Sequence, residues 1–217
     1  MKRCQLLKPG LVEYGKAWEI QKDLFRARSQ DEIIDTLLIL QHPPTYTFGR
    51  RSQVGQYPPP LMRGGADIFR VDRGGGATYH GPGQLIAYPI VELKSYTTDF
   101  YTYLRMLEEV MIGTLAGFNI RSQCLKGYTG VWVDGEKIGS IGVRIIRGYT
   151  MHGLSLNVNN DLAPFDKIIP CNLMGVKITS MSKISGTNLN ISEVEEHLIH
   201  HFAKVFDVAI SPETFLF

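Results

Sequence analysis

Apolar residues recur along this chain with a helical spacing in three segments. These segments cover about residues 14–25, 98–116 and 192–205. The second ends at Gly117. The third begins with Ser192 and has Glu195 three residues later, which predicts a capping box at its N-terminus. Its predicted buried face consists of Val194, Leu198, Phe202 and Val205.

Short apolar runs between turn residues predict the strands. These runs cover residues 36–41, 45–48, 68–71, 85–91, 130–133, 137–146, 149–158 and 176–181. Asp134-Gly135 and Arg147-Gly148 separate three of the runs, and such dipeptides favour tight hairpins, so those strands should be antiparallel. Because the helices and strands do not alternate as regular βαβ repeats, we predict an α+β fold with a mixed, largely antiparallel sheet and flanking helices.

Length and composition indicate one ordinary globular unit. The chain has 217 residues, of which 44% are hydrophobic and 20% charged, so residues 1–217 can form a single domain with a full core. The N-terminus lacks the apolar core of a signal peptide, and no apolar run approaches the length of a membrane helix. We therefore expect a cytoplasmic protein without membrane contact, and a monomer.

The net charge of +2 is too small to indicate nucleic-acid binding. Five arginines nevertheless give residues 50–73 a local positive bias. They are Arg50, Arg51, Arg63, Arg70 and Arg73. Such a cluster is either a solvated face or a docking patch for an acidic partner protein.

The segment from Arg73 to Gln84 reads RGGGATYHGPGQ, and its five glycines lie between two predicted strands. A flexible backbone presented from a sheet is typical of a binding loop, because glycine lets main-chain N–H groups approach a ligand. Tyr79 stands where a dinucleotide fingerprint requires glycine. Ala17 stands where a phosphate loop starting at Gly10 would require Ser or Thr. Neither nucleotide motif is therefore present.

Three cysteines occur, at Cys4, Cys124 and Cys171, without a CxxC pair, so neither a disulfide framework nor a zinc site is indicated. We interpret Cys4 and Cys124 as buried and inert. Cys171 follows Pro170 in a polar turn, which leaves two readings open, a buried thiol or a nucleophile.

Lys137 begins a predicted strand that contains two glycines, where a packed strand would normally carry side chains. It is either a solvated charge or a cation that favours a neighbouring thiolate and carries protons. His197, His200 and His201 share the last helix without a ligand partner at metal spacing, and we expect them at the surface without a metal.

Residues 73–88 closely resemble the signature of the lipoyl(octanoyl) transferases. Further segments resemble this family in the same order along the chain, and the resemblance covers nearly all of it. They are residues 14–21, 40–43, 130–133 with 137–144, 152–158, and Ile169-Pro-Cys171 with Thr179-Ser180.

The resemblance implies a fold similar to the biotin and lipoate protein ligases, with Cys171 and Lys137 as the catalytic pair and no cofactor. It also implies which residues hold the acyl group. These are Arg73, Gly74, Gly75, Gly76, Ala77, Thr78, Tyr79, His80, Ser140, Ile141, Gly142, Gly153, Leu154 and Ser155. Asn172 departs from the family, which usually has glycine after the cysteine.

The activity implied is transfer of an octanoyl group from octanoyl-acyl carrier protein to a lysine of lipoyl domains, through a thioester on Cys171. The acceptors implied are the 2-oxo acid dehydrogenase complexes and the glycine cleavage H protein. Two other classes stay open, an ATP-dependent lipoate ligase and a binding module without catalysis.

Overall fold

The computed structural model of the chain describes residues 2–52, 65–169 and 175–212. Within these ranges the strands form one large and one small sheet. The large sheet contains β1 (Lys2–Leu11), β2 (Thr36–Gln41), β6 (Gln84–Ile90), β7 (Val131–Val133), β8 (Glu136–Ile146), β9 (Tyr149–Asn157) and β10 (Val208–Pro212). The small sheet contains β3 (Thr45–Phe48), β4 (Asp67–Arg70) and β5 (Ala77–His80).

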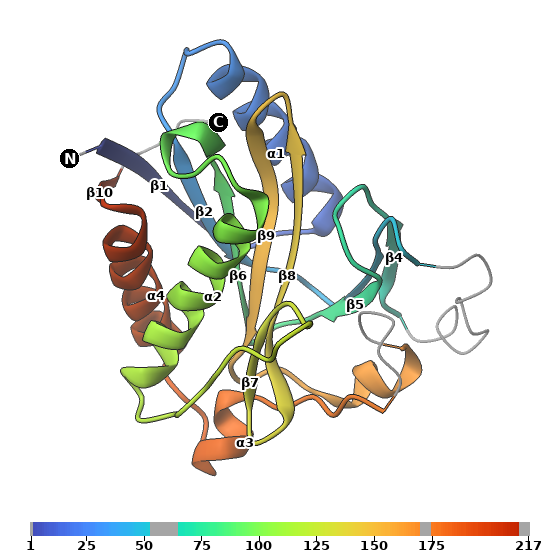
Figure 1. The fold of residues 1–217 in the computed structure, drawn as a ribbon. Helices are drawn as coiled ribbons and strands as arrows, with labels where there is room; N and C mark the ends of the chain where they lie inside the picture. Colours follow the sequence, from blue (N-terminus) through green and yellow to red (C-terminus); the bar gives the residue numbers. More distant parts are fainter. Residues whose placement is uncertain (1, 53–64, 170–174, 213–217) are drawn as a thin grey trace.

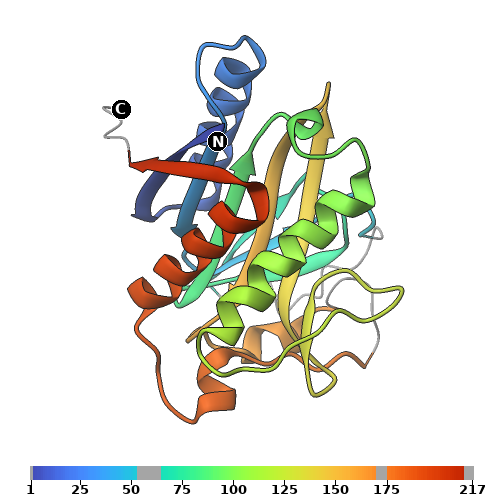
Figure 2. The same cartoon turned by 60° about the vertical axis from the view of Figure 1, so that its left-hand side comes forward.

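The helices are α1 (Tyr14–Ser29), α2 (Phe100–Ala116), α3 (Met181–Ser185) and α4 (Ile191–Phe206), with 3₁₀ turns at Leu93–Ser95 and Ala163–Lys167. Helices α2 and α4 lie side by side over one face of the large sheet (Figures 1 and 2). Helix α1 packs on the other face. No helix in the described part of the chain is both long and apolar enough to span a membrane.

Strand β2 shows why a central strand can carry a continuous apolar run. Leu37 and Ile39 belong to the core beneath α2 and α4, whereas Leu38 and Leu40 pack with α1. Successive side chains of a strand point to opposite faces, so covering both faces requires a continuous apolar run. The large sheet is therefore the central layer of the molecule.

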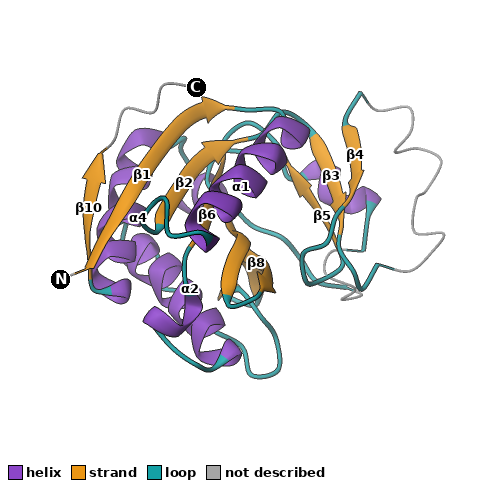
Figure 3. Cartoon of the chain, turned by 90° about the horizontal axis from the view of Figure 1, so that it is seen from above, coloured by secondary structure: helices purple, strands orange, loops and turns teal. Residues whose placement is uncertain are grey.

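The order of the large sheet is β10-β1-β2-β6-β9-β8-β7. Strand β1 runs parallel to β10 and β2, and the remaining neighbours are antiparallel. The small sheet, ordered β4-β3-β5, lies beside it, away from β10 (Figure 3). The predicted α+β fold with a mixed, largely antiparallel sheet is thus confirmed.

Both predicted hairpins are present. Asp134 and Gly135 join β7 to β8 with φ of +48° and +82°, and Arg147 and Gly148 join β8 to β9 with +50° and +89°. Two consecutive residues with positive φ are the mark of a type I′ turn, whose twist matches that of the flanking strands. The antiparallel pairing from β7 to β9 follows from these local turns.

Two local predictions were wrong, and two strands were not predicted. Residues 176–181 do not form a strand, since only Ile178 makes an isolated bridge, to Lys137, and Met181 begins α3. Residues 77–80 of the glycine-rich segment are strand β5 rather than loop. Strands β1 and β10 were not predicted, because β1 mixes charged residues with Pro9 and Gly10 and pairs with a strand about 200 residues away.

The N-terminus of α4 also differs from the prediction. Asn190 is the N-cap, and its side chain accepts a hydrogen bond from the Ser192 backbone N–H. Glu195 is not part of a capping box, because it forms an ion pair with Lys8 of β1 at 2.6 Å. At the other end Phe206 is buried, while Val205 is half-buried.

The surface prediction for the histidines of α4 is correct only for His200. His197 and His201 are half-buried against the glycines of α2. A Cβ on Gly117 or Gly113 would lie 2.3 Å from the Nδ1 atom of His197 or His201, respectively. The two glycines therefore let α4 approach α2 closely.

Candidate active site

A pocket lies between the middle of β8 and β9 and the segment that enters β5. Ten of the residues predicted to hold the acyl group line it, although they come from distant parts of the chain. They are Arg73, Gly75, Thr78, His80, Ser140, Ile141, Gly142, Gly153, Leu154 and Ser155. Its volume is about 40 Å³, room for a few water molecules.

The other four predicted residues do not line this pocket. Ala77 and Tyr79 alternate with Thr78 along β5 and pack in the apolar cluster of the small sheet, because neighbouring residues of a strand face opposite sides. Gly74 donates its N–H to the Val143 carbonyl, and the Gly76 carbonyl accepts the N–H of Gly49. These two glycines hold the segment in place through their backbone.

Arg73 is buried, so the structure does not place it on a solvated face with the exposed Arg50, Arg51 and Arg70. Its Nη2 atom donates to the carbonyl and hydroxyl oxygens of Thr47, both at 2.8 Å. Its Nη1 atom donates to the Gly74 carbonyl at 2.9 Å. Arg73 thus supplies a fixed positive charge inside the pocket. Arg63, the remaining arginine of the predicted basic cluster, lies outside the described residues.

His80 is held as a neutral imidazole. Its Nδ1–H donates to Oε1 of Gln84 at 2.7 Å, and Gln84 in turn donates to Asn157 at 2.8 Å. The Nε2 atom lies 3.3 Å from the Thr47 hydroxyl, which donates to it because that oxygen already accepts from Arg73. Burial lowers the pKa of His80 well below its usual value, and His42 and Arg73 lower it further.

The pocket also contains Tyr14 and Tyr88, which the sequence reasoning missed. His42, at the end of β2, donates from Nδ1 to the Val12 carbonyl and accepts from the Tyr88 hydroxyl at 2.9 Å. Burial lowers the pKa of His42 to about 4. Tyr14 stacks on His80 with 5.9 Å between ring centroids. Tyr14 and His42 both lie in segments that resemble the family, which was the available signal.

His152 lies near His42 and His80, and the three residues form a histidine cluster. The sequence reasoning missed His152 as well. It has φ of +57°, a conformation that costs a residue with a side chain about 1 kcal/mol or more. Its Nε2–H donates to Asp72 at 2.8 Å, and Asp72 also pairs with Arg144. Burial lowers its pKa to about 3, and Nδ1 is a buried acceptor without a partner among the described residues.

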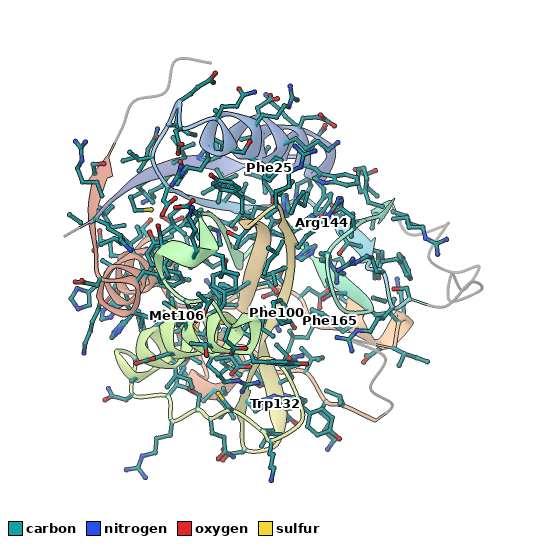
Figure 4. All side chains as sticks on the ribbon, turned by 45° about the horizontal axis from the view of Figure 1, so that its top comes forward. Phe25, Phe100, Met106, Trp132, Arg144 and Phe165 are labelled. Carbon is teal, nitrogen blue, oxygen red and sulfur yellow. The ribbon has the colours of Figure 1, made fainter. Side chains whose placement is uncertain are left out.

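Lys137 is buried, with 3% of its surface exposed, so it is not a solvated charge. Its Nζ donates to the Thr129 carbonyl at 2.9 Å and lies 5.4 Å from the centre of the Trp132 ring. The backbone of Lys137 bonds to Lys177 and Thr179, which follow Cys171 in the chain. Trp132 and Arg144 mark the two ends of this β7–β8 region in Figure 4.

Cys171 and Asn172 lie outside the described residues. Cys4 is fully buried, and burial raises its pKa far above the usual value for a thiol. Cys124 is half-buried, donates to Glu108 at 3.0 Å and has its pKa raised to about 11 by burial and that carboxyl. Neither thiol is prepared to ionise near neutral pH.

Among the described residues no group of three His, Cys, Asp or Glu side chains is arranged to hold a metal ion. The chemical character of the pocket instead comes from one guanidinium, neutral imidazoles, hydroxyls and glycine backbone. Such a site can orient a carbonyl group and stabilise a developing negative charge on it.

The fold is that of the lipoate and biotin protein ligases. A bipartite lipoate protein ligase of Thermoplasma acidophilum superposes with a TM-score of 0.74, at 17% identity over 99% of this chain and 87% of that one. A biotin protein ligase of Aquifex aeolicus gives 0.58 at 14% identity, over 95% of this chain and 71% of that one.

Within that class the chain belongs to the family of lipoyl protein ligase A/B catalytic domains, whose model matches residues 13–203. An octanoyltransferase of Rubrobacter xylanophilus is 46% identical over 202 residues, covering 91% of this chain and 90% of that protein. The octanoyltransferase of Gloeobacter violaceus is 39% identical over 98% of this chain and 94% of its own length. The predicted family is thereby confirmed.

Proposed function

We propose that this protein is an octanoyltransferase in which Cys171 is the nucleophile and Lys137 the proton carrier, with residues 1–217 acting as one catalytic unit. The donor is octanoyl-acyl carrier protein and the acceptors are lysines of lipoyl domains, including those of 2-oxo acid dehydrogenase complexes and the glycine cleavage H protein. The observation that carries the proposal is the convergence of three distant segments on one pocket along β8, the strand that also bears Lys137.

The reaction has two balanced halves. The thiolate of Cys171 attacks the octanoyl carbonyl, its Sγ–C bond forms, and the carrier thiol leaves with a proton from Lys137. A lysine amine of the lipoyl domain then attacks the new thioester, Lys137 accepts the amine's proton, and Cys171 leaves. Exchange of one thioester for another is nearly isoenergetic and amide formation is downhill, so ATP is not required.

The geometry of His80 supports Lys137 as the proton carrier. A general base must have a basic atom free to reach the substrate, but both His80 nitrogens are in hydrogen bonds and its pKa is lowered. Arg73 and the glycine N–H groups are better suited to orient the thioester carbonyl.

Intact-mass measurement after mixing the protein with octanoyl-acyl carrier protein tests the nucleophile. We expect one octanoyl adduct, mapped by peptide sequencing to Cys171 and absent in Cys171→Ala. Cys4→Ala and Cys124→Ala are the matched controls and should keep the adduct. An adduct on Cys4 or Cys124 would refute the assignment.

Lys137→Arg and Lys137→Met divide the role of the lysine. Arginine keeps a positive charge but does not release its proton, so this variant should alkylate readily with iodoacetamide yet fail to pass the acyl group to the acceptor. Methionine should slow both steps. Formation of an adenylate from ATP, magnesium and free octanoate would instead favour a ligase.

A further inference from the structure

A carboxyl group in the core approaches Lys137 without touching it. Glu108 of α2 is fully buried, although helix faces that pack on a sheet are normally apolar. Its Oε1 atom accepts the Gly130 backbone N–H at 2.7 Å. Its Oε2 atom accepts from Arg105, whose side chain is 48% exposed, and from the thiol of Cys124 at 3.0 Å.

The Gly130 N–H and the Thr129 carbonyl are the two ends of one peptide group. Glu108 holds the N–H end, and the carbonyl end accepts the Lys137 ammonium at 2.9 Å. Donors and acceptors joined in this way polarise one another, so the carboxyl strengthens the carbonyl as an acceptor. The hydrogen bonds that link Glu108 to Lys137 therefore pass through one rigid, planar peptide group.

Glycine at position 130 is required for this arrangement. Gly130 has φ of +117°, and a Cβ there would lie 2.7 Å from Cε of Lys137 and 2.5 Å from the Gly139 carbonyl. The peptide passes closely over the lysine, and Gly130 has no side chain that could hold its orientation. Its buried N–H must find an acceptor, and the acceptor that the structure supplies is Glu108.

We propose that Glu108 is a positioning residue for acyl transfer, which orients the Thr129–Gly130 peptide so that its carbonyl holds the Lys137 amine in place. The inference rests on the proposed function, because it assigns Glu108 a role in a reaction that uses Lys137. Its essential contribution is the position of the carboxyl oxygen rather than the negative charge.

Two substitutions separate position from charge. Glu108→Gln keeps an acceptor oxygen at the same reach and removes the charge. Glu108→Asp keeps the charge and withdraws the oxygen by one methylene, beyond reach of the Gly130 N–H. We expect Glu108→Asp to lower kcat by about tenfold to a hundredfold with little change in KM for octanoyl-acyl carrier protein, since small misplacements have effects of that order. Glu108→Gln should retain most of kcat.

A second measurement follows Lys137 itself. Brief labelling with acetic anhydride, read by peptide mass spectrometry, reports how accessible each amine is, with the exposed Lys94 and Lys183 as internal standards. Release of Lys137 from the carbonyl should raise its labelling several-fold in Glu108→Asp and much less in Glu108→Gln. A purely structural role of Glu108 would not single out this amine in protein that stays folded.

Cys124→Ala is the matched control, because it removes another hydrogen bond to the same carboxyl and leaves the peptide alone. Unchanged labelling in Glu108→Asp, or raised labelling with unchanged kcat, would overturn the inference. Equal loss in Glu108→Gln and Glu108→Asp would also overturn it. If the wild-type protein does not transfer octanoyl groups, the proposed function fails, while the labelling still tests the link from Glu108 to Lys137.

Discussion

At the scale of single residues, two paired glycines of the pocket leave no room for a side chain, each for a different reason. Gly142 of β8 faces Gly153 of β9 across the sheet. A Cβ on Gly142 would lie 2.9 Å from Cδ of Arg73, whereas a Cβ on Gly153 would lie 2.2 Å from the Ala87 carbonyl of β6. The first clash involves a side chain of the pocket, and the second involves the backbone of the sheet.

We therefore expect Gly142→Ala and Gly153→Ala to separate function from stability. Gly142→Ala should displace Arg73 and raise KM for the octanoyl donor about tenfold, a change of about 1.4 kcal/mol, and it should cost less folding free energy than Gly153→Ala. Gly153→Ala should destabilise the protein by about 3 kcal/mol, because the backbone of a packed sheet cannot give way. Urea unfolding and steady-state kinetics measure both effects, and equal loss of stability in the two variants would contradict this reading.

At the scale of elements, periodicity located the helices but the caps were decided by neighbours. The sequence S-E-V-E predicted a capping box, yet Asn190 caps α4 two residues earlier and Glu195 is engaged with Lys8. An ion pair to a neighbouring strand was available to Glu195 only in the folded chain. A local motif therefore placed the helix and misplaced its first turn.

Alanine substitution at the two candidate caps tests the N-terminus of α4. Asn190→Ala removes the hydrogen bond to the Ser192 N–H and should lower the free energy of unfolding by about 1 kcal/mol. Ser192→Ala, at an exposed side chain, should change it by at most a few tenths of a kcal/mol. Thermal and urea unfolding provide the measurement, and the reverse order would restore the capping box.

At the scale of the whole molecule, His42, His80 and His152 come from three different strand regions and meet beside Arg73 between the two sheets. Their pKa values are lowered, to about 4 for His42 and about 3 for His152. Unfolded histidine has a pKa near 6.5, so below that pH the unfolded chain binds more protons than the native one. The protein should therefore lose stability as pH falls.

The pH range of this loss follows from the same values. Stability should be fully present above about pH 6.5 and fall as pH drops toward about 4, with a slope approaching about 4 kcal/mol per pH unit for three protons. Urea midpoints at pH 7, 6 and 5 measure it. His42→Gln removes one titrating group and should reduce the slope by about a third. A flat profile from pH 7 to 5 would show that folding does not lower the pKa values of these three histidines.

The sequence by itself determined those features that depend on neighbouring residues. The two type I′ hairpins, the helical segments and the family signature were all readable, because turn geometry and amphipathic spacing are local. The resemblance implied which segments would hold the acyl group, and ten of those predicted residues line one pocket. The roles assigned to Cys171 and Lys137 stay predictions.

Only the tertiary structure decided which residues of a motif face the pocket and which partners reach it. The alternation of β5 sends Thr78 and His80 toward the pocket and Ala77 and Tyr79 into the apolar cluster of the small sheet. This arrangement depends on where residues 73–84 change from loop to strand. Strands β1 and β10, the histidine cluster and the hydrogen bond from the Gly130 N–H to Glu108 join residues that are not neighbours in sequence. Such contacts arise from burial in a shared core, which no short window of sequence contains.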